Sequence, residues 1–239
     1  AAVGSASLLK AVLGERCVLI DAPRNEVLRQ RDAIMLEEIA SRASSLLLFP
    51  SSESAPLDAV VLAERQHRDS GGCGGDGDFG QPGARSLVVV DGSWKTAANL
   101  VSKNTVLAPE SIRHVHLSPE LTGVSWYMRA GLRSEPKRGF VSTAEAAAVA
   151  LRVLSDGRDG ACGEIVEHFQ RFVQKTVEAT ELSAPASALK QIAIRRNQCE
   201  SEEQAVDPVG PPITNSHREW QLLAITKMKP AKKGQRRKK

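Results

Sequence analysis

An acidic and an aromatic side chain stand at the end of the most hydrophobic run of the sequence, where they could bind or activate a ligand. The run SLVVVDGSW (86–94) places Asp91 and Trp94 after four consecutive apolar residues. In open α/β proteins, ligands bind beyond the carboxyl ends of the strands, so both side chains would border a ligand site. Asp91 is either a turn residue before glycine or an acceptor of a proton or hydrogen bond in a cleft. Trp94 is either a core residue or the wall of a ligand pocket.

The segment VSTAEAAAVALRVL (141–154) carries a helix start that could hold an anion. Ser142 and Glu145 have the Ser-x-x-Glu spacing of a capping box, and an alanine-rich helix follows them. A helix N-terminus presents unpaired N–H groups and positive potential, which favour a bound carboxylate. From these residues alone, the simpler interpretation is that Ser142 and Glu145 satisfy only each other.

Basic residues gather in two stretches that could contact the phosphates of a nucleic acid. The first lies within SWYMRAGLRSEPKRG (125–139) and comprises Arg129, Arg133, Lys137 and Arg138; the alternative there is a solvated loop. The second is KMKPAKKGQRRKK (227–239), which holds eight Lys or Arg and no acid. The whole chain has a net charge of +4, so the remainder carries about −4. Such a tail meets phosphates, directs nuclear import or only solubilises; its RNA-contact candidates are Lys232, Lys233, Arg236 and Arg237.

Several classes of site find no support in the sequence. His114 and His116 alternate onto one strand face, but no nearby acid or cysteine completes a metal site. The sequence has no C-x-x-C pair, which disfavours zinc and disulfides and favours a reducing compartment; its cysteines are Cys17, Cys73, Cys162 and Cys199. Neither a G-x-S-x-G, an H-E-x-x-H nor a Walker loop is present. No apolar run reaches the roughly 20 residues of a membrane span. We therefore predict no metal and no membrane association.

Four short apolar runs predict strands that are buried on both faces of a parallel sheet: 17–22, 45–50, 86–92 and 114–118. Helical patterns alternate with them, at 26–43, 94–103, 142–154 and 163–180. This alternation predicts an α/β fold, with a mostly parallel sheet and helices on both of its faces.

The domain is predicted to span residues 1–180, and two further segments follow it. Residues 65–85 are rich in Gly, Asp and Arg and are expected to form a disordered surface insertion. The G-x-G-x-x-G spacing inside it follows polar residues and precedes a strand, so it is not a phosphate loop. Residues 181–226 are predicted to form a short helix (186–196) and a linker, and residues 227–239 the basic tail.

Three ordered segments resemble the DTW-domain family, which is named for an Asp-x-Thr-Trp signature: LLLFPSSESAPL (46–57), VVVDGSWKTAANL (88–100) and SWYMRAGLRSEPKRGFVSTAEAAAVAL (125–151). Three separated motifs in the correct order are fairly specific, and the resemblance covers roughly residues 17–175. It implies a SPOUT-like α/β fold that is knotted in its C-terminal half. It also implies a tRNA-uridine aminocarboxypropyltransferase, which moves the 3-amino-3-carboxypropyl group of S-adenosylmethionine to N3 of a uridine and releases methylthioadenosine.

The resemblance carries site residues over position by position. Those matching the family's cofactor-binding segments are Leu48, Phe49, Pro50, Ser51, Asp91, Trp94, Ser125, Tyr127, Ser142, Thr143 and Glu145. Ser93 stands where the signature has threonine, and Arg129 and Arg133 compete for one family position. Many members carry an N-terminal cysteine cluster that looks zinc-binding, and no such cluster occurs in this sequence.

Under this hypothesis Asp91 accepts the proton of uridine N3, and the helix start at Ser142 holds the methionine carboxylate of the donor. The expected partner is tRNA, no protein partner is evident, and the expected location is the cytoplasm, the nucleus or both. Two alternatives remain open: an RNA methyltransferase that uses the same donor, and an RNA-binding protein without catalytic activity.

Overall fold

The structure is a computed structural model that describes residues 5–23, 26–41, 45–70, 85–132, 141–155, 157, 159–203 and 220–227. Its strands are β1 (Cys17–Ala22), β2 (Ser45–Leu48), β3 (Ala55–Pro56), β4 (Arg85–Asp91), β5 (Arg113–His116) and β6 (Trp220–Lys227). Its longer helices are α1 (Ser5–Leu13), α2 (Gln30–Ala40), α3 (Leu57–Ser70), α4 (Trp94–Ser102), α7 (Thr143–Leu154), α8 (Ala161–Ser183) and α9 (Ala186–Glu203). Single turns form η1 (Gly14–Arg16), η2 (Thr105–Leu107), α5 (Pro119–Thr122) and α6 (Trp126–Arg129).

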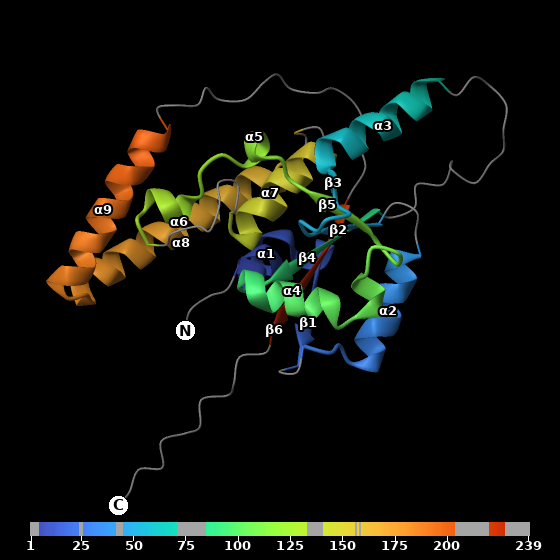
Figure 1. The fold of residues 1–239 in the computed structure, drawn as a ribbon, viewed down its shortest axis with the longest axis horizontal. Coiled ribbons are helices and arrows are strands. Elements are labelled where there is room, and N and C mark those ends of the chain that lie inside the picture. The colour runs from blue at the N-terminus through green and yellow to red at the C-terminus, as the bar shows by residue number, and fades with distance from the viewer. Residues whose placement is uncertain are drawn as a thin grey trace, which may run out of the picture.

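The six strands of the described residues form one sheet in the order β1-β6-β4-β2-β5-β3, and every neighbouring pair is parallel (Figure 1). The central strands carry uninterrupted apolar residues because both of their faces are covered. Leu87 and Val89 of β4 point to one face, and Val88 and Val90 point to the other. The predicted parallel α/β sheet with helices on both faces is therefore confirmed.

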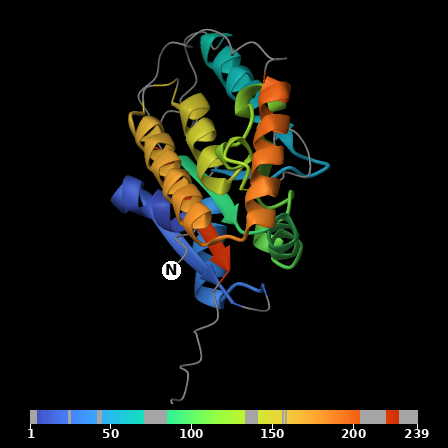
Figure 2. The ribbon, with the colours of Figure 1, turned by 90° about the vertical axis from the view of Figure 1, so that its left-hand side faces the viewer.

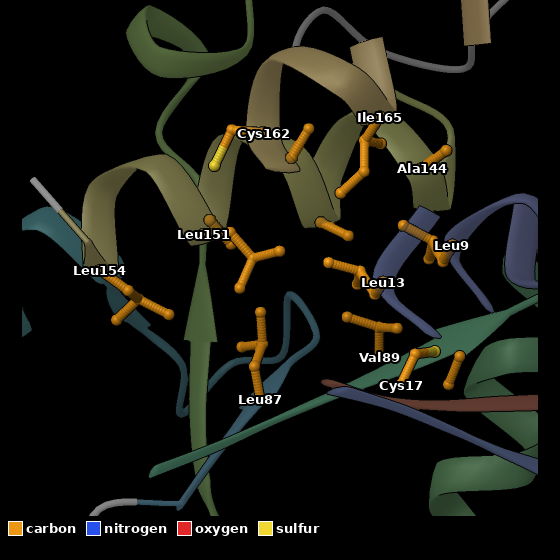
Figure 3. Packing of buried hydrophobic residues seen from close by; sticks show 14 of the residues in the cluster. Leu9, Leu13, Cys17, Leu87, Val89, Ala144, Leu151, Leu154, Cys162 and Ile165 are labelled. Atoms are coloured by element: carbon orange, nitrogen blue, oxygen red, sulfur yellow. The ribbon is translucent and has the colours of Figure 1, made fainter. Parts of the chain in front are cut away.

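The helices divide between the two faces of the sheet. Helices α1, α3, α7 and α8 cover one face, and α2 and α4 cover the other. Figure 3 shows the first layer, in which Leu9 and Leu13 of α1 meet Leu151 of α7 above Val89 of the sheet. Alanines at 144, 147, 148 and 150 let α7 approach closely, and all four are buried. Helix α7 thereby packs closely against this face of the sheet.

Strand β6 corrects the sequence analysis, which assigns residues 220–227 to the linker and the start of the tail. The segment WQLLAITK instead fills the position between β1 and β4, as the red arrow in Figure 2 shows. Ala224 and Ile225 are fully buried there, one toward each helical layer. Pro-rich and basic neighbours on either side obscured this apolar run in the sequence.

Two further expectations differ from the structure. Residues 65–70 continue α3, although they were expected to begin the surface insertion; residues 71–84 lie outside the described residues. Helix α2 starts at Gln30 and not at residue 26. Glu26 has φ +64°, which a helix does not allow, and its N–H donates to the Pro23 carbonyl at 2.9 Å in a turn.

The implied knot depends on connections that include residues 204–219, which also lie outside the described residues, so it stays a prediction. Within the described part, no helix has the length and apolar character needed to cross a membrane.

Candidate functional site

A cavity of about 400 Å³ lies at the carboxyl ends of β2, β4 and β5 and beside the first turn of α7. Because every strand is parallel, the carboxyl ends meet at one edge of the sheet, and the loops that follow them enclose the space. The cavity walls are Ser5, Leu48, Phe49, Pro50, Val89, Val90, Asp91, Gly92, Trp94, Ala97, His116, Leu117, Pro119, Thr122, Val141, Ser142, Thr143 and Ala146. Apolar side chains predominate, with a few polar groups among them, as in sites for small organic ligands.

Asp91, at the end of β4, is a hydrogen-bond acceptor in a cleft, which is one of the two alternatives that the sequence left open; its role as a proton acceptor stays a prediction. It lines the cavity, and its Oδ2 atom accepts a 3.2 Å hydrogen bond from the backbone N–H of Ala6. Ala6 lies in the first turn of α1, whose N–H groups have no partner within the helix. The carboxylate therefore anchors α1 against the end of β4 while part of its surface remains open to the cavity.

Trp94 is the first residue of α4 and forms part of the cavity wall. Ser93 precedes it as the N-cap, and its hydroxyl accepts a 3.2 Å hydrogen bond from the N–H of Thr96. A serine at the position of the signature threonine supplies the same capping oxygen, so the helix that positions Trp94 is preserved.

The capping box at the start of α7 is confirmed, but Glu145 does more than cap. Its carboxylate accepts hydrogen bonds from the Ser142 N–H at 2.9 Å and the Trp126 N–H at 2.7 Å. The Ser125 hydroxyl adds a third bond of 3.1 Å to the same carboxylate. Glu145 is 8% exposed and joins the start of α6 to the start of α7. The interpretation that Ser142 and Glu145 satisfy only each other is therefore wrong.

One backbone N–H group at the start of α7, that of Thr143, is available to a ligand in the cavity. The N–H groups of Glu145 and Ala146 bond to the side chain and carbonyl of Ser142. Those of Thr143 and Ala144 make no hydrogen bond to any described residue, but Ala144 is fully buried and only Thr143 lines the cavity. Ser142 and Thr143 line the cavity, so the positive end of α7 borders it.

The structure brings together seven of the residues that the sequence analysis selected for cofactor binding: Leu48, Phe49, Pro50, Asp91, Trp94, Ser142 and Thr143. The other four lie outside the cavity wall. Ser125 and Glu145 bond to each other behind the start of α7. Ser51 bonds through its hydroxyl to His114 Nδ1 at 3.0 Å.

Tyr127 packs its ring edge-on against Phe169 with 5.2 Å between centroids. It borders a separate, open pocket of about 550 Å³ between α6, α8 and α9. Tyr127 is therefore placed away from the cavity at the strand ends.

Of the residues selected for RNA contact, the structure describes only Arg129. Its side chain is exposed, its guanidinium carbon lies 4.9 Å from the centroid of the Trp126 ring, and its Nε donates to the Val124 carbonyl. Arg133, Lys137, Arg138, Lys232, Lys233, Arg236 and Arg237 lie outside the described residues.

His116 belongs to the cavity wall, although the sequence analysis considered it only as a metal ligand. Its Nδ1 atom lies 2.9 Å from the hydroxyl of Ser54. The signal for its role was its place at the end of a predicted strand, the same rule that selected Asp91. In the described part of the chain, no group of three or more His, Cys, Asp or Glu side chains could hold a metal ion.

Comparison with known proteins gives two matches. The DTW domain family matches residues 2–177. The chain is also similar to the tRNA-uridine aminocarboxypropyltransferase 2 of Drosophila melanogaster, with 30% identity over 139 residues. The aligned part covers 58% of this chain but only 45% of the fly protein, so the chain spans less than half the length of that relative. No solved structure shows a significant match.

Proposed function

Because this chain belongs to the DTW domain family, we propose that it transfers the 3-amino-3-carboxypropyl group of S-adenosylmethionine to N3 of a uridine in tRNA. The observation that carries the proposal is the meeting of three separate motif segments around one cavity. The segment after β2, the signature residues after β4 and the start of α7 all contribute to its walls. A family match alone would not require these segments to enclose a common space.

The residues of the cavity fit the donor. A space of about 400 Å³ is within the range for small-molecule ligands, and walls such as Leu48, Phe49 and Trp94 suit an adenosine group. The free N–H group of Thr143, in the cavity wall, suits a carboxylate at the positive end of a helix. The Asp91 carboxylate complements the positive charge of the donor's amino group or sulfonium.

The protein's main contribution to the reaction is position. When bound, the donor supplies an electrophilic methylene carbon next to its sulfonium. A carboxylate held by α7 fixes which of the three carbons on sulfur faces the acceptor, and so favours transfer of the aminocarboxypropyl group over the methyl group. The new bond joins uridine N3 to the methylene carbon, the carbon–sulfur bond breaks, and methylthioadenosine leaves. The N3 proton must pass to an acceptor in the cavity, a role that the sequence analysis assigns to Asp91.

On the RNA side, we place the substrate against the pair formed by exposed Arg129 and half-buried Trp126, since a stacked guanidinium and indole suit a nucleotide. The basic tail with Lys232, Lys233, Arg236 and Arg237 would add contacts to phosphates that do not depend on sequence. The basic residues Arg133, Lys137 and Arg138 are proposed to contact the same RNA. The SPOUT-like knot and a cytoplasmic or nuclear location are parts of the same proposal.

The test is a transfer assay with unmodified tRNA and two preparations of labelled S-adenosylmethionine. One preparation is labelled in the S-methyl group and the other in the methionine carboxyl carbon. We expect carboxyl label in tRNA and methyl label in methylthioadenosine. Methyl label in tRNA would instead make the protein a methyltransferase. If tRNA binds, the donor does not bind and neither label is transferred, the alternative of an RNA-binding protein without catalytic activity is favoured.

A further inference from the structure

Among the described residues that line the cavity, the titratable side chains are Asp91 and His116. They come from the ends of β4 and β5, on either side of the end of β2. A proton that leaves a ligand inside the cavity therefore has two candidate acceptors. Their hydrogen bonds distinguish them.

The hydrogen bonds around Ser54 fix where His116 carries its proton. The Ser54 hydroxyl donates to the Ser51 carbonyl oxygen at 2.8 Å and accepts the Ser51 N–H at 3.1 Å. The hydroxyl also lies 2.9 Å from His116 Nδ1. Since its only proton is already donated to Ser51, the hydroxyl must accept from Nδ1–H. The neutral His116 ring therefore has its proton on Nδ1 and a lone pair on Nε2.

The Nε2 atom of His116 makes no hydrogen bond to any described residue. His114, two residues earlier on the same strand, differs: its Nε2 donates to the Leu107 carbonyl at 2.7 Å and its Nδ1 accepts from Ser51. Both nitrogens of His114 are thus occupied, and its side chain is buried. Of the two histidines on β5, only His116 combines a cavity position with an unoccupied basic nitrogen.

Asp91 is less suited to accept a proton at its engaged oxygen. Its Oδ2 already accepts the Ala6 N–H, and protonation there would cost the bond that anchors α1. The carboxylate also complements a cationic donor only as long as it stays charged. Both considerations favour His116 over Asp91 as the proton acceptor.

We propose that His116 Nε2 accepts the N3 proton of the substrate uridine as N3 bonds to the donor's methylene carbon. This inference rests on the proposed function and assigns one step within it. The N3–H bond breaks, its electron pair forms the N3–carbon bond, and the imidazole becomes an imidazolium. The Nδ1–H bond to Ser54 persists in both protonation states, so Ser54 is a positioning residue that holds the ring in place.

The first test examines the proton position without any assay of activity. Protein labelled with ¹⁵N in its histidines is observed by two-dimensional NMR at a pH where the rings are neutral, and His116→Gln assigns the signals. We expect His116 to show a protonated Nδ1 and an unprotonated Nε2, and Ser54→Ala to weaken that preference. A His116 ring with its proton on Nε2 in the wild-type protein would overturn the inference.

The second test measures transfer to tRNA that contains uridine or 5-fluorouridine, whose N3 proton is more acidic. Wild-type transfer of the carboxyl label must come first, because its failure would remove the proposed function together with this step. We expect His116→Gln to slow transfer to uridine by about 100-fold or more. The loss on 5-fluorouridine should be at least about tenfold smaller, because a stronger acid depends less on the base. Added imidazole should partly restore His116→Ala.

His168→Gln is the matched control, because His168 is exposed on α8 and borders neither pocket. Donor affinity measured by calorimetry separates a catalytic loss from a folding or binding loss. Equal losses on the two substrates with weakened donor binding would give His116 a binding role and overturn the inference. A full wild-type rate in His116→Gln would overturn it as well. If Asp91→Asn, and not His116→Gln, slows transfer to uridine more than transfer to 5-fluorouridine, Asp91 is the proton acceptor and the inference is overturned.

Discussion

The Oδ2 atom of Asp91, at the end of β4, accepts a 3.2 Å hydrogen bond from the N–H of Ala6, in the first turn of α1. A residue in the family signature thus links the cavity to a helix that lies 85 positions earlier in the chain. The carboxylate caps α1 with one oxygen and faces the cavity as a fixed negative charge. Substitutions of Asp91 can therefore separate the effect of the hydrogen bond to Ala6 from the effect of the negative charge.

Asp91→Asn keeps an oxygen for the Ala6 N–H and removes only the charge, whereas Asp91→Ala removes both. We expect Asp91→Ala to lower the free energy of unfolding by about 1 kcal/mol, the usual effect of losing a helix cap. Asp91→Asn should unfold close to the wild-type midpoint, yet bind S-adenosylmethionine more weakly because the opposing charge is lost. Urea denaturation and calorimetry measure the two effects. Equal stability of both variants would show that the bond to Ala6 does not anchor α1.

Glu145 is expected to be among the least replaceable side chains near the cavity. Glu145→Ala leaves the N–H groups of Ser142 and Trp126 without their acceptor, at about 1–3 kcal/mol for each. Ser125→Ala is the matched control, because it leaves the carboxylate in place and removes the third bond together with the 3.3 Å cap bond from the Tyr127 N–H to the Ser125 hydroxyl. We expect Glu145→Ala to be clearly less stable than Ser125→Ala by urea denaturation. Similar unfolding midpoints for the two variants would contradict the joining role of Glu145.

Local sequence patterns were sufficient for the parts of the fold that depend on local physics. The strand at 17–22 and the capped helix that follows Ser142 agree with the structure to within a residue, because apolar runs and the capping box act over a few positions. Contacts between distant residues could not be found this way. The Asp91–Ala6 bond, the three donors of Glu145 and the pairing of β6 with β4 all join segments that no spacing rule connects.

In the candidate site, too, sequence patterns selected positions but could not reveal contacts between distant residues. Strand-end positions pointed to Asp91 and to the segment after β2, the capping-box spacing pointed to Ser142, and the family resemblance added Thr143. The resemblance could not separate residues that line the cavity from those that support it, such as Ser125 and Glu145. His116 was missed because its type was weighed only for metal binding. Its role depends on the proton of Ser54, which is a property of three-dimensional contacts.

Two buried thiols predict a loss of stability in alkaline solution. Burial raises the pKa of Cys17 and that of Cys162 from 9.0 to about 11. Between these values the unfolded chain releases thiol protons that the folded protein retains, so the free energy of unfolding falls as pH rises from about 9 to about 11. Below about 9 both states keep these protons, and the contribution is fully present. Urea denaturation at several pH values measures the slope.

The control for the alkaline slope is the double variant Cys17→Ala, Cys162→Ala. Its other groups titrate as in the wild-type protein, so the difference between the two slopes isolates the thiols. We expect the variant to lose less stability over this pH window. Identical slopes would mean that the thiols ionise as readily in the folded protein as in the unfolded chain.

Gly131 is expected to control the docking of α9, which lies beyond the segment that matches the family. Gly131 has φ +69°, and a Cβ there would lie 2.4 Å from the carbonyl oxygen of Ile192 in α9. Beside it, Arg196 donates to the Ala130 carbonyl at 3.0 Å, so α9 is packed tightly against the turn after α6 (Figure 1). Gly157→Ala is the matched control, since Gly157 has φ +73° but no atom within 4 Å of its Cβ position.

In the control variant Gly157→Ala, the free energy of unfolding should fall only by the cost of a left-handed backbone, about 1–2 kcal/mol. Gly131→Ala should lower the free energy of unfolding by that amount and by about 1–3 kcal/mol more for the steric overlap. The protein can relieve this overlap by releasing α9. Hydrogen exchange should therefore accelerate across residues 186–203 in Gly131→Ala and stay at the wild-type rate there in Gly157→Ala. Equal protection of α9 in both variants would mean that the helix is held by Arg196 and its other contacts, and that the close approach at Gly131 is incidental.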